Sequence, residues 1–165
     1  MSSRVPRSWK ASFSPREVEG TLDAKGRRLG VVVARWNPTV TDALLACALA
    51  TLERCGARVA DVHVVRVPGA FELPAAAKAL IAGRRLDAVI VLGAIVRGQT
   101  SHHEVLAHAV ASALAGLSAE TGVPVGFGLL TCDTMEQARE RSGKGTEAAE
   151  AAIEMANLRR RLARR

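Results

Sequence analysis

The chain has 165 residues, of which 48% are hydrophobic and 24% charged, and its formal net charge is +7. This length suits a single domain, and this composition excludes a wholly disordered chain. Arg, Asp, Glu or His interrupts every apolar run before it reaches the ~18 residues of a membrane span, and no hydrophobic signal core opens the sequence. We therefore expect a cytoplasmic protein without membrane contact.

The excess positive charge lies at the two ends of the sequence. Residues 1–16 contain four basic residues and no acid, and residues 159–165 contain five arginines and no acid. The sequence between them has slightly more acidic than basic side chains. A basic tail can bind RNA, but a solvated chain end is its more common role, so we expect no nucleic acid partner. We predict an N-terminal tail over 1–16, one domain over 17–158 and an Arg-rich tail over 159–165.

From about residue 27, strand and helix patterns alternate along the chain. Stretches rich in apolar and β-branched residues predict strands at residues 30–34, 62–67, 88–96 and 124–130, and the run at 30–34 is continuously apolar, as in a strand buried on both faces. Apolar residues at helical spacing predict helices at residues 40–55, 73–82, 101–121, 135–141 and 146–162. Strands joined by helices indicate right-handed crossovers and a parallel sheet. The fold class we expect is α/β: a three-layer α/β/α sandwich around a mainly parallel four-stranded sheet of flavodoxin-like order, with room for an added N-terminal strand.

Two further patterns concern the cysteines and the last helix. Cys47 and Cys55 fall inside a helical pattern, and no His or Cys spacing resembles a metal-ligand set, which predicts buried free thiols and no metal. The last helix carries two apolar stripes, one of Ala149, Ala152, Ile153 and Ala156, the other of Ala151, Met155, Leu158 and Leu162. One stripe covers a sheet, and the second predicts burial against another subunit.

The loop after the third predicted strand has the richest chemistry. Ser101 and Glu104 fit the S-x-x-E capping box, so a helix should begin here with Ser101 as its cap. Free backbone N–H groups at such a helix start favour an anion. His102 and His103 would lie beside this anion site, where the helix dipole favours a neutral imidazole that can accept and return a proton. The plain alternative is a pair of surface histidines near a cap.

Other strand-end loops suit a planar, phosphorylated ligand. Arg97 and Arg141 could bind phosphate through bidentate guanidinium contacts, although an arginine in such a position is more often a plain surface residue. Trp36 and Phe71 could stack on a ring or belong to the core, and Glu72 could bind a hydroxyl or an amine or simply stabilise a helix start. No G-x-G-x-x-G or P-loop motif is present, which excludes those nucleotide sites. The residues alone thus predict an oligomeric α/β domain that binds a phosphorylated small molecule and carries a proton-transferring histidine.

At these positions the sequence closely resembles the lumazine synthase family, which acts in riboflavin biosynthesis. The resemblance covers about residues 29–158, and its matching segments are Ala34-Arg35-Trp36-Asn37, Val67-Pro68-Gly69-Ala70-Phe71-Glu72-Leu73-Pro74, Val91-Leu92-Gly93-Ala94-Ile95-Val96-Arg97-Gly98, Thr121-Gly122-Val123-Pro124-Val125 and Ala152-Ile153-Glu154-Met155-Ala156-Asn157-Leu158. Several long matches in the same order make this resemblance very specific.

The resemblance implies a reaction that needs no cofactor. In it, 5-amino-6-(D-ribitylamino)uracil condenses with 3,4-dihydroxy-2-butanone 4-phosphate to give 6,7-dimethyl-8-ribityllumazine, through a Schiff base and loss of phosphate and water. The general acid/base of the family falls on His102. The phosphate contacts of the family fall on Gln99, Thr100 and Arg141. Its contacts to the pyrimidine and the ribityl chain fall on Trp36, Ala70, Phe71, Glu72, Ala94, Ile95, Val96 and Phe127.

The resemblance also implies a homopentamer in which adjacent subunits share each site, with Phe127 and the phosphate-binding arginine supplied by the neighbour. Pentamer, decamer and sixty-subunit shell all stay open, as does an association with riboflavin synthase. Trp36 replaces a more usual phenylalanine, and Gln99, Ser101 and His103 also depart from the family pattern. These departures leave one alternative open, in which His103 and not His102 is the general acid/base. The linker after Gly143 is shorter than usual.

Three other functions fit parts of the sequence. An archaeal-type riboflavin synthase is related, but the intact Gly69–Glu72 turn and the pair Thr100 and His102 argue against it. A lumazine- or flavin-binding assembly protein would tolerate the departures at Trp36 and His103. A shell whose basic ends bind nucleic acid would lose a steep salt dependence of binding when residues 159–165 are removed.

Overall fold

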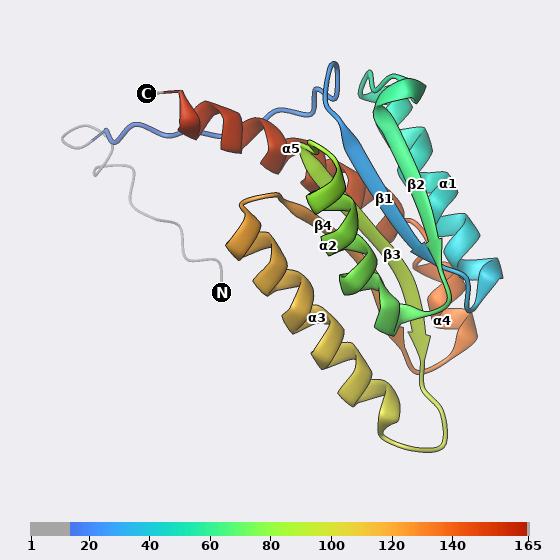
Figure 1. The fold of residues 1–165 in the computed structure, drawn as a ribbon. Helices are drawn as coiled ribbons and strands as arrows, with labels where there is room; N and C mark the ends of the chain where they lie inside the picture. The colour runs from blue at the N-terminus through green and yellow to red at the C-terminus, as the bar shows by residue number, and fades with distance from the viewer. Residues whose placement is uncertain (1–13, 165) are drawn as a thin grey trace.

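The protein is a three-layer α/β/α sandwich in a computed structural model that describes residues 14–164 (Figure 1). Four parallel strands form the central sheet: β1 (Leu29–Ala34), β2 (Val62–Val67), β3 (Ala88–Val96) and β4 (Val125–Cys132). Their order, β2-β1-β3-β4, is the flavodoxin-like order expected. The added N-terminal strand is not found in the described part of the chain, where residues 14–28 pair with no strand. Residues 1–13, most of the expected N-terminal tail, lie outside that part.

Helices cover both faces of the sheet, as Figure 1 shows. One face carries α1 (Pro38–Arg54), α4 (Met135–Glu140) and α5 (Lys144–Ala163); the other carries α2 (Leu73–Gly83) and α3 (His102–Thr121). Two short 3₁₀ turns, η2 (Val59–Asp61) and η3 (Ala70–Glu72), flank β2. The inner strands β1 and β3 are buried along their length except at Val96, which explains why their sequences are continuously apolar.

Glycines allow α5 to lie very close to its neighbours. A Cβ at Gly145 would overlap the Leu44 carbonyl oxygen of α1, and a Cβ at Gly126 of β4 would overlap the Ala148 carbonyl oxygen of α5. The first apolar stripe of α5 is buried in this contact. On the second stripe, Met155 is 47% exposed and Leu162 59% exposed, so this stripe faces away from the sheet.

The segment before β1 is bound to the second half of α5. The buried Asn157 side chain donates from Nδ2 to the carbonyl oxygens of Thr21 (2.7 Å) and Asp23 (2.8 Å), and its Oδ1 accepts from Arg27 Nε (2.7 Å). Arg161 Nη1 donates to the Glu19 carbonyl oxygen (2.8 Å). Within the C-terminal tail expected over 159–165, α5 continues to Ala163, and Arg161 bonds to Glu19 of the domain.

The three cysteines of the chain are free thiols that differ in burial. Cys132 is buried, but Cys47 and Cys55 are only half-buried, which corrects the expectation of fully buried thiols. Cys47 lies on a partly exposed side of α1 and Cys55 caps the C-terminal end of that helix, so helical spacing alone overstated their burial. No helix within residues 14–164 is long and apolar enough to cross a membrane.

Candidate active site

The loops that follow the four strands meet at one edge of the sheet, the lower edge in Figure 1. Backbone hydrogen bonds extend the sheet into these loops. Arg35 N donates to the Val67 carbonyl oxygen (2.8 Å), Trp36 N to that of Pro68 (3.1 Å) and Arg97 N to that of Cys132 (2.9 Å). The parallel sheet therefore holds the sequence-predicted site loops in fixed register, at the edge where ligands bind in such folds.

Asn37 fixes the loop after β1. Its backbone is left-handed (φ 60°), and its Nδ2 donates to the Ala94 carbonyl oxygen of β3 (2.9 Å). Asn tolerates this conformation better than most residues, and the bond across the sheet holds it there. Trp36 is thereby presented from a rigid turn directly before α1.

Two aromatic side chains are exposed at this edge. Trp36 is 74% exposed and Phe71 70% exposed. The alternative that these two aromatic residues belong to the core is therefore wrong. A Cβ at Gly69 would lie 3.9 Å from Trp36 Cδ2, so the indole lies over the start of the turn that carries Phe71. The Glu72 carboxylate closes this turn by accepting from Gly69 N (2.9 Å). The pair offers a planar ligand a surface to stack on.

Residues at the end of β3 form the floor of this region. Ala94 and Ile95 are each 6% exposed and Val96 is half-buried, while Ala70 beside them is 8% exposed. Their side chains are therefore largely covered within the chain. These residues can therefore contact a ligand only through backbone groups and small apolar surfaces.

The start of α3 differs from the predicted capping box. Ser101 is the N-cap residue, but its φ of −74° and ψ of 5° are not extended, and its side chain makes no capping bond. An N-cap hydroxyl reaches the backbone of the first turn only from extended dihedrals. Thr100 Oγ1 instead accepts weakly from His102 N (3.4 Å). Gln99, Thr100 and Ser101 are exposed, so this end of the helix is open to an anion.

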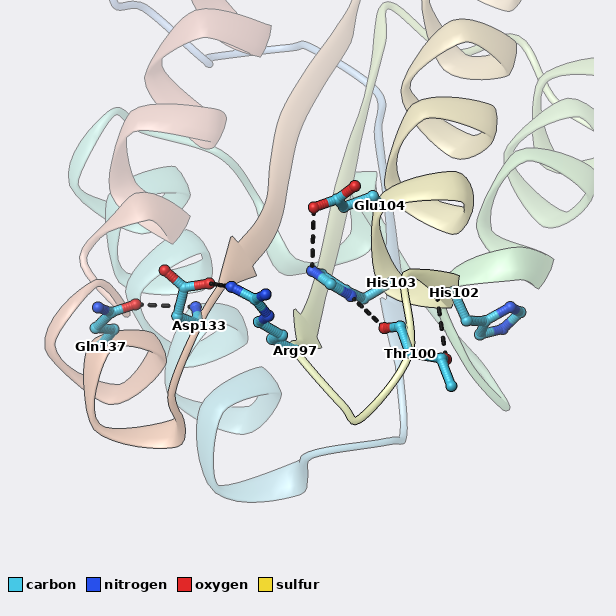
Figure 2. A network of polar contacts seen from close by, with 7 residues as sticks. All are labelled: Arg97, Thr100, His102, His103, Glu104, Asp133 and Gln137. Atoms are coloured by element: carbon cyan, nitrogen blue, oxygen red, sulfur yellow. Dashed lines mark hydrogen bonds and ion pairs between the residues drawn. The ribbon is translucent and has the colours of Figure 1, made fainter.

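The structure separates the roles of the two histidines, as Figure 2 shows. The His103 ring turns inward: its side chain is 10% exposed, its Nδ1 lies 3.0 Å from the Thr100 carbonyl oxygen, and its Nε2 lies 3.8 Å from Glu104 Oε1. The His102 ring points away from this network, and within residues 14–164 no hydrogen bond to it is formed. His103 thus braces the loop, while His102 is free to meet a ligand.

An ion pair that sequence reasoning missed joins the loops after β3 and β4. Arg97 Nη1 lies 3.4 Å from Asp133 Oδ1, and Asp133 N donates to Gln137 Oε1 (2.9 Å; Figure 2). Arg97 was one of two arginines considered as phosphate partners, with a surface arginine as the alternative, and its guanidinium is turned toward Asp133. The signal in the sequence was the matching position of the two residues, each directly after a neighbouring strand.

Arg141 lies beside β4, on a different part of the edge. It lines a cavity of about 450 Å³ with residues of β4, the α4–α5 turn and the start of α5. No residue of the loop 97–101 and neither histidine lines that cavity, so within one chain Arg141 and His102 do not share a pocket. Arg141 forms no ion pair with the described residues and is exposed.

Cys132 and Phe127 are the remaining groups on β4. Burial raises the pKa of the Cys132 thiol above its ordinary value of 9.0; the Arg141 guanidinium opposes this rise and Asp133 adds to it.

Phe127 is 41% exposed and lies on β4, opposite Val91 of β3. It lines a separate apolar cavity of about 480 Å³ against α3. Within one chain, the cavity that Phe127 lines therefore includes no residue of the strand-end loops.

Chemically, the edge offers a free imidazole, an open helix N-terminus and an exposed aromatic pair. Among residues 14–164, no group of three or more His, Cys, Asp and Glu side chains is placed to hold a metal ion. A parallel α/β domain with such an edge belongs to the class whose small-molecule sites lie at the carboxyl ends of the strands.

Comparison with known proteins identifies the family within this class. Residues 26–160 match the family of 6,7-dimethyl-8-ribityllumazine synthase. A protein of that name from Desulfotalea psychrophila is 52% identical over 149 residues, which cover 87% of this chain and 96% of the relative. Another, from Syntrophus aciditrophicus, is 48% identical over 153 residues, which cover 90% and 99% of the two chains. The chain belongs to the 6,7-dimethyl-8-ribityllumazine synthase family, whose members are transferases.

Proposed function

We propose that this protein catalyses the condensation of 5-amino-6-(D-ribitylamino)uracil with 3,4-dihydroxy-2-butanone 4-phosphate to 6,7-dimethyl-8-ribityllumazine, a step of riboflavin biosynthesis. The family match over residues 26–160 is the observation that carries the proposal. The reaction needs no metal or cofactor, since the amine is the nucleophile and phosphate is the leaving group. We place it in the cytoplasm, where three free cysteines stay reduced.

His102 is the proposed general acid/base. Attack of the 5-amino nitrogen on the ketone carbon forms a C–N bond, and water leaves to give the Schiff base. Each of these steps moves a proton, as does the loss of phosphate. The free ring of His102 at the start of α3 supports this role, because an imidazole held by other side chains could not move to serve several atoms. The braced ring of His103 favours His102 over it.

The phosphate of the second substrate is proposed to bind Gln99 and Thr100 at the N-terminus of α3, together with Arg141. Open N–H groups and a guanidinium stabilise the charge that develops on the leaving phosphate. Trp36 and Phe71 would stack on the pyrimidine, and Glu72, Ala70 and the end of β3 would contact its ring and ribityl chain. Much of the acceleration would come from aligning the two substrates.

A homo-oligomer built on pentamers is proposed to complete the site. In one chain, Arg141 and Phe127 line cavities that the His102 loop does not reach. A neighbouring subunit could bring both residues to His102, and the exposed Met155 and Leu162 of α5 offer apolar surface for subunit contact. This arrangement is why the proposed site combines residues from distant parts of the fold.

The test is turnover with both substrates. We expect lumazine absorbance and released phosphate to rise together, much faster than in buffer, where the two compounds condense spontaneously. A rate equal to the spontaneous one would refute the proposed function and leave a binding protein. Sedimentation velocity on the same sample should show an oligomer, and a fully active monomer would refute the shared site.

A further inference from the structure

A second cavity of about 450 Å³ lies at the opposite edge of the sheet, where the strands begin. Its walls come from residues before β1 and β3, from the turn after α2 and from the last turns of α5. Its lining includes the arginines Arg28, Arg84, Arg85, Arg159 and Arg160. Since parallel strands begin at one edge and end at the other, this cavity is separate from the candidate active site.

The charged residues that line this cavity are almost all positive. Asp87 is its one acidic lining residue, and the Asp87 Oδ2 atom accepts from Arg28 N (2.8 Å). None of the five arginines forms an ion pair with a carboxylate of residues 14–164, whereas Arg54, Arg58, Arg66 and Arg139 elsewhere on the surface each do. Five positively charged side chains that line one hollow repel one another, and a bound anion would reduce this repulsion.

The backbone at this edge is well fixed. Asp87 N donates to the Arg28 carbonyl oxygen (2.7 Å), and Leu86 N donates to that of Arg84 (3.1 Å). The Arg84 side chain is also held, with Nη1 3.2 Å from His63 Nε2. The guanidinium groups therefore extend from an ordered rim, with Leu86, Val123, Ala156 and Ala163 completing the lining.

We propose that this cavity binds a small anion with several linked phosphates, of the kind present in inorganic triphosphate and in nucleoside triphosphates. Guanidinium binds phosphate in a bidentate manner, and five such groups suit a chain of phosphates better than a single one. The volume is that of a small-molecule site. The lining contains no aromatic residue, so the phosphate chain, and not a base, is what the cavity recognises.

Calorimetric titration of the full-length protein with inorganic triphosphate tests this proposal. The test variant is Arg84→Gln with Arg160→Gln, which removes one guanidinium from the turn after α2 and one from α5. The matched control is Arg54→Gln with Arg58→Gln, which removes the same charge from a surface outside the cavity. We expect the test variant to weaken triphosphate binding about tenfold or more and the control to weaken it about twofold at most, since guanidinium contacts to phosphate are strong but distant surface charges are screened.

Three further measurements make the result specific. Triphosphate at one concentration should raise the melting temperature of the unmodified protein more than that of the test variant, whose melting temperature without ligand should be near normal. ATP should bind about as tightly as triphosphate, and Arg141→Gln should leave triphosphate binding unchanged. The proposal is overturned by equal weakening in the test and control variants, by loss of binding in Arg141→Gln, by binding of ATP without triphosphate, or by binding of an RNA homopolymer alone.

Discussion

Asn37 donates from its side-chain nitrogen to the carbonyl oxygen of Ala94, across 2.9 Å, while its own backbone is left-handed. This bond ties the turn that carries Trp36 to the end of the central strand β3. It joins the aromatic residue Trp36 of the candidate site to a buried inner strand of the sheet.

Replacing Asn37 should therefore reduce stability. Asn37→Ala loses the bond and leaves a left-handed alanine, which together should lower the free energy of unfolding by about 1–3 kcal/mol. Asn37→Gly loses only the bond and should cost about 1 kcal/mol less. Urea unfolding of the three proteins measures the difference. Equal stability of the two variants would show that the backbone conformation adds no strain.

Gly145 should tolerate no side chain. A Cβ there would overlap the Leu44 carbonyl oxygen, so Gly145→Ala must push α5 away from α1 and should lower the free energy of unfolding by about 2 kcal/mol or more. Gly143→Ala, two residues earlier, is the control, because no atom lies within 4 Å of its Cβ position. Its unfolding midpoint should stay within experimental error of normal or rise slightly. Comparable losses in both variants would contradict the close approach.

The two histidines should differ in kinetics. His102→Gln should reduce kcat about tenfold or more with little change in melting temperature, because it removes a proton-transferring ring that the fold does not use. His103→Gln should reduce kcat less and lower the melting temperature more, because it removes the brace between Thr100 and Glu104. Steady-state kinetics beside thermal melts check both. A larger kcat loss in His103→Gln would transfer the role of base to that residue.

Arg141 should affect the phosphorylated substrate alone. Arg141→Gln should raise the KM for the butanone phosphate about tenfold while the KM for the pyrimidine changes little, since only the first carries phosphate. Arg139→Gln is the control: it removes the same charge from the neighbouring turn, where Arg139 pairs with Glu136 (3.9 Å). Initial rates with each substrate varied in turn give both constants. A rise in both KM values, or an equal effect in Arg139→Gln, would place Arg141 outside the phosphate site.

Much of the fold could be predicted from sequence because inner strands of a parallel sheet need uninterrupted apolar residues. The inner strand Ala88–Val96 begins and ends as predicted, and so does the edge strand Val62–Val67, whose pattern is less apolar. The last helix starts earlier than predicted, at Lys144, since Gly145 looks like a break but is the residue that lets α5 touch Leu44. That reason lies in a tertiary contact and not in local propensity.

The candidate site was predictable in position but not in detail. Strand-end loops had to meet at one edge, and they do. Sequence pattern could not show that Thr100 would replace Ser101 in capping α3, nor that Arg97 would turn to Asp133. Both depend on backbone dihedrals and side-chain rotamers, which a residue pattern does not specify. Whether Arg141 meets His102 depends on a second subunit and remains a prediction.

The hydrogen bonds of Asn157 and Arg161 also have a practical consequence. They hold residues 19–23 along the last helix, so both ends of the described chain leave the domain on one side, away from the loops that carry His102 and Trp36 (Figure 1). A fluorescent label or fusion partner joined to either end of the described chain would project from that side and leave the edge with the candidate active site unobstructed. Removing the chain past Thr21 would instead take away a carbonyl acceptor of the buried Asn157 amide, so the ends are better extended than trimmed for labelling.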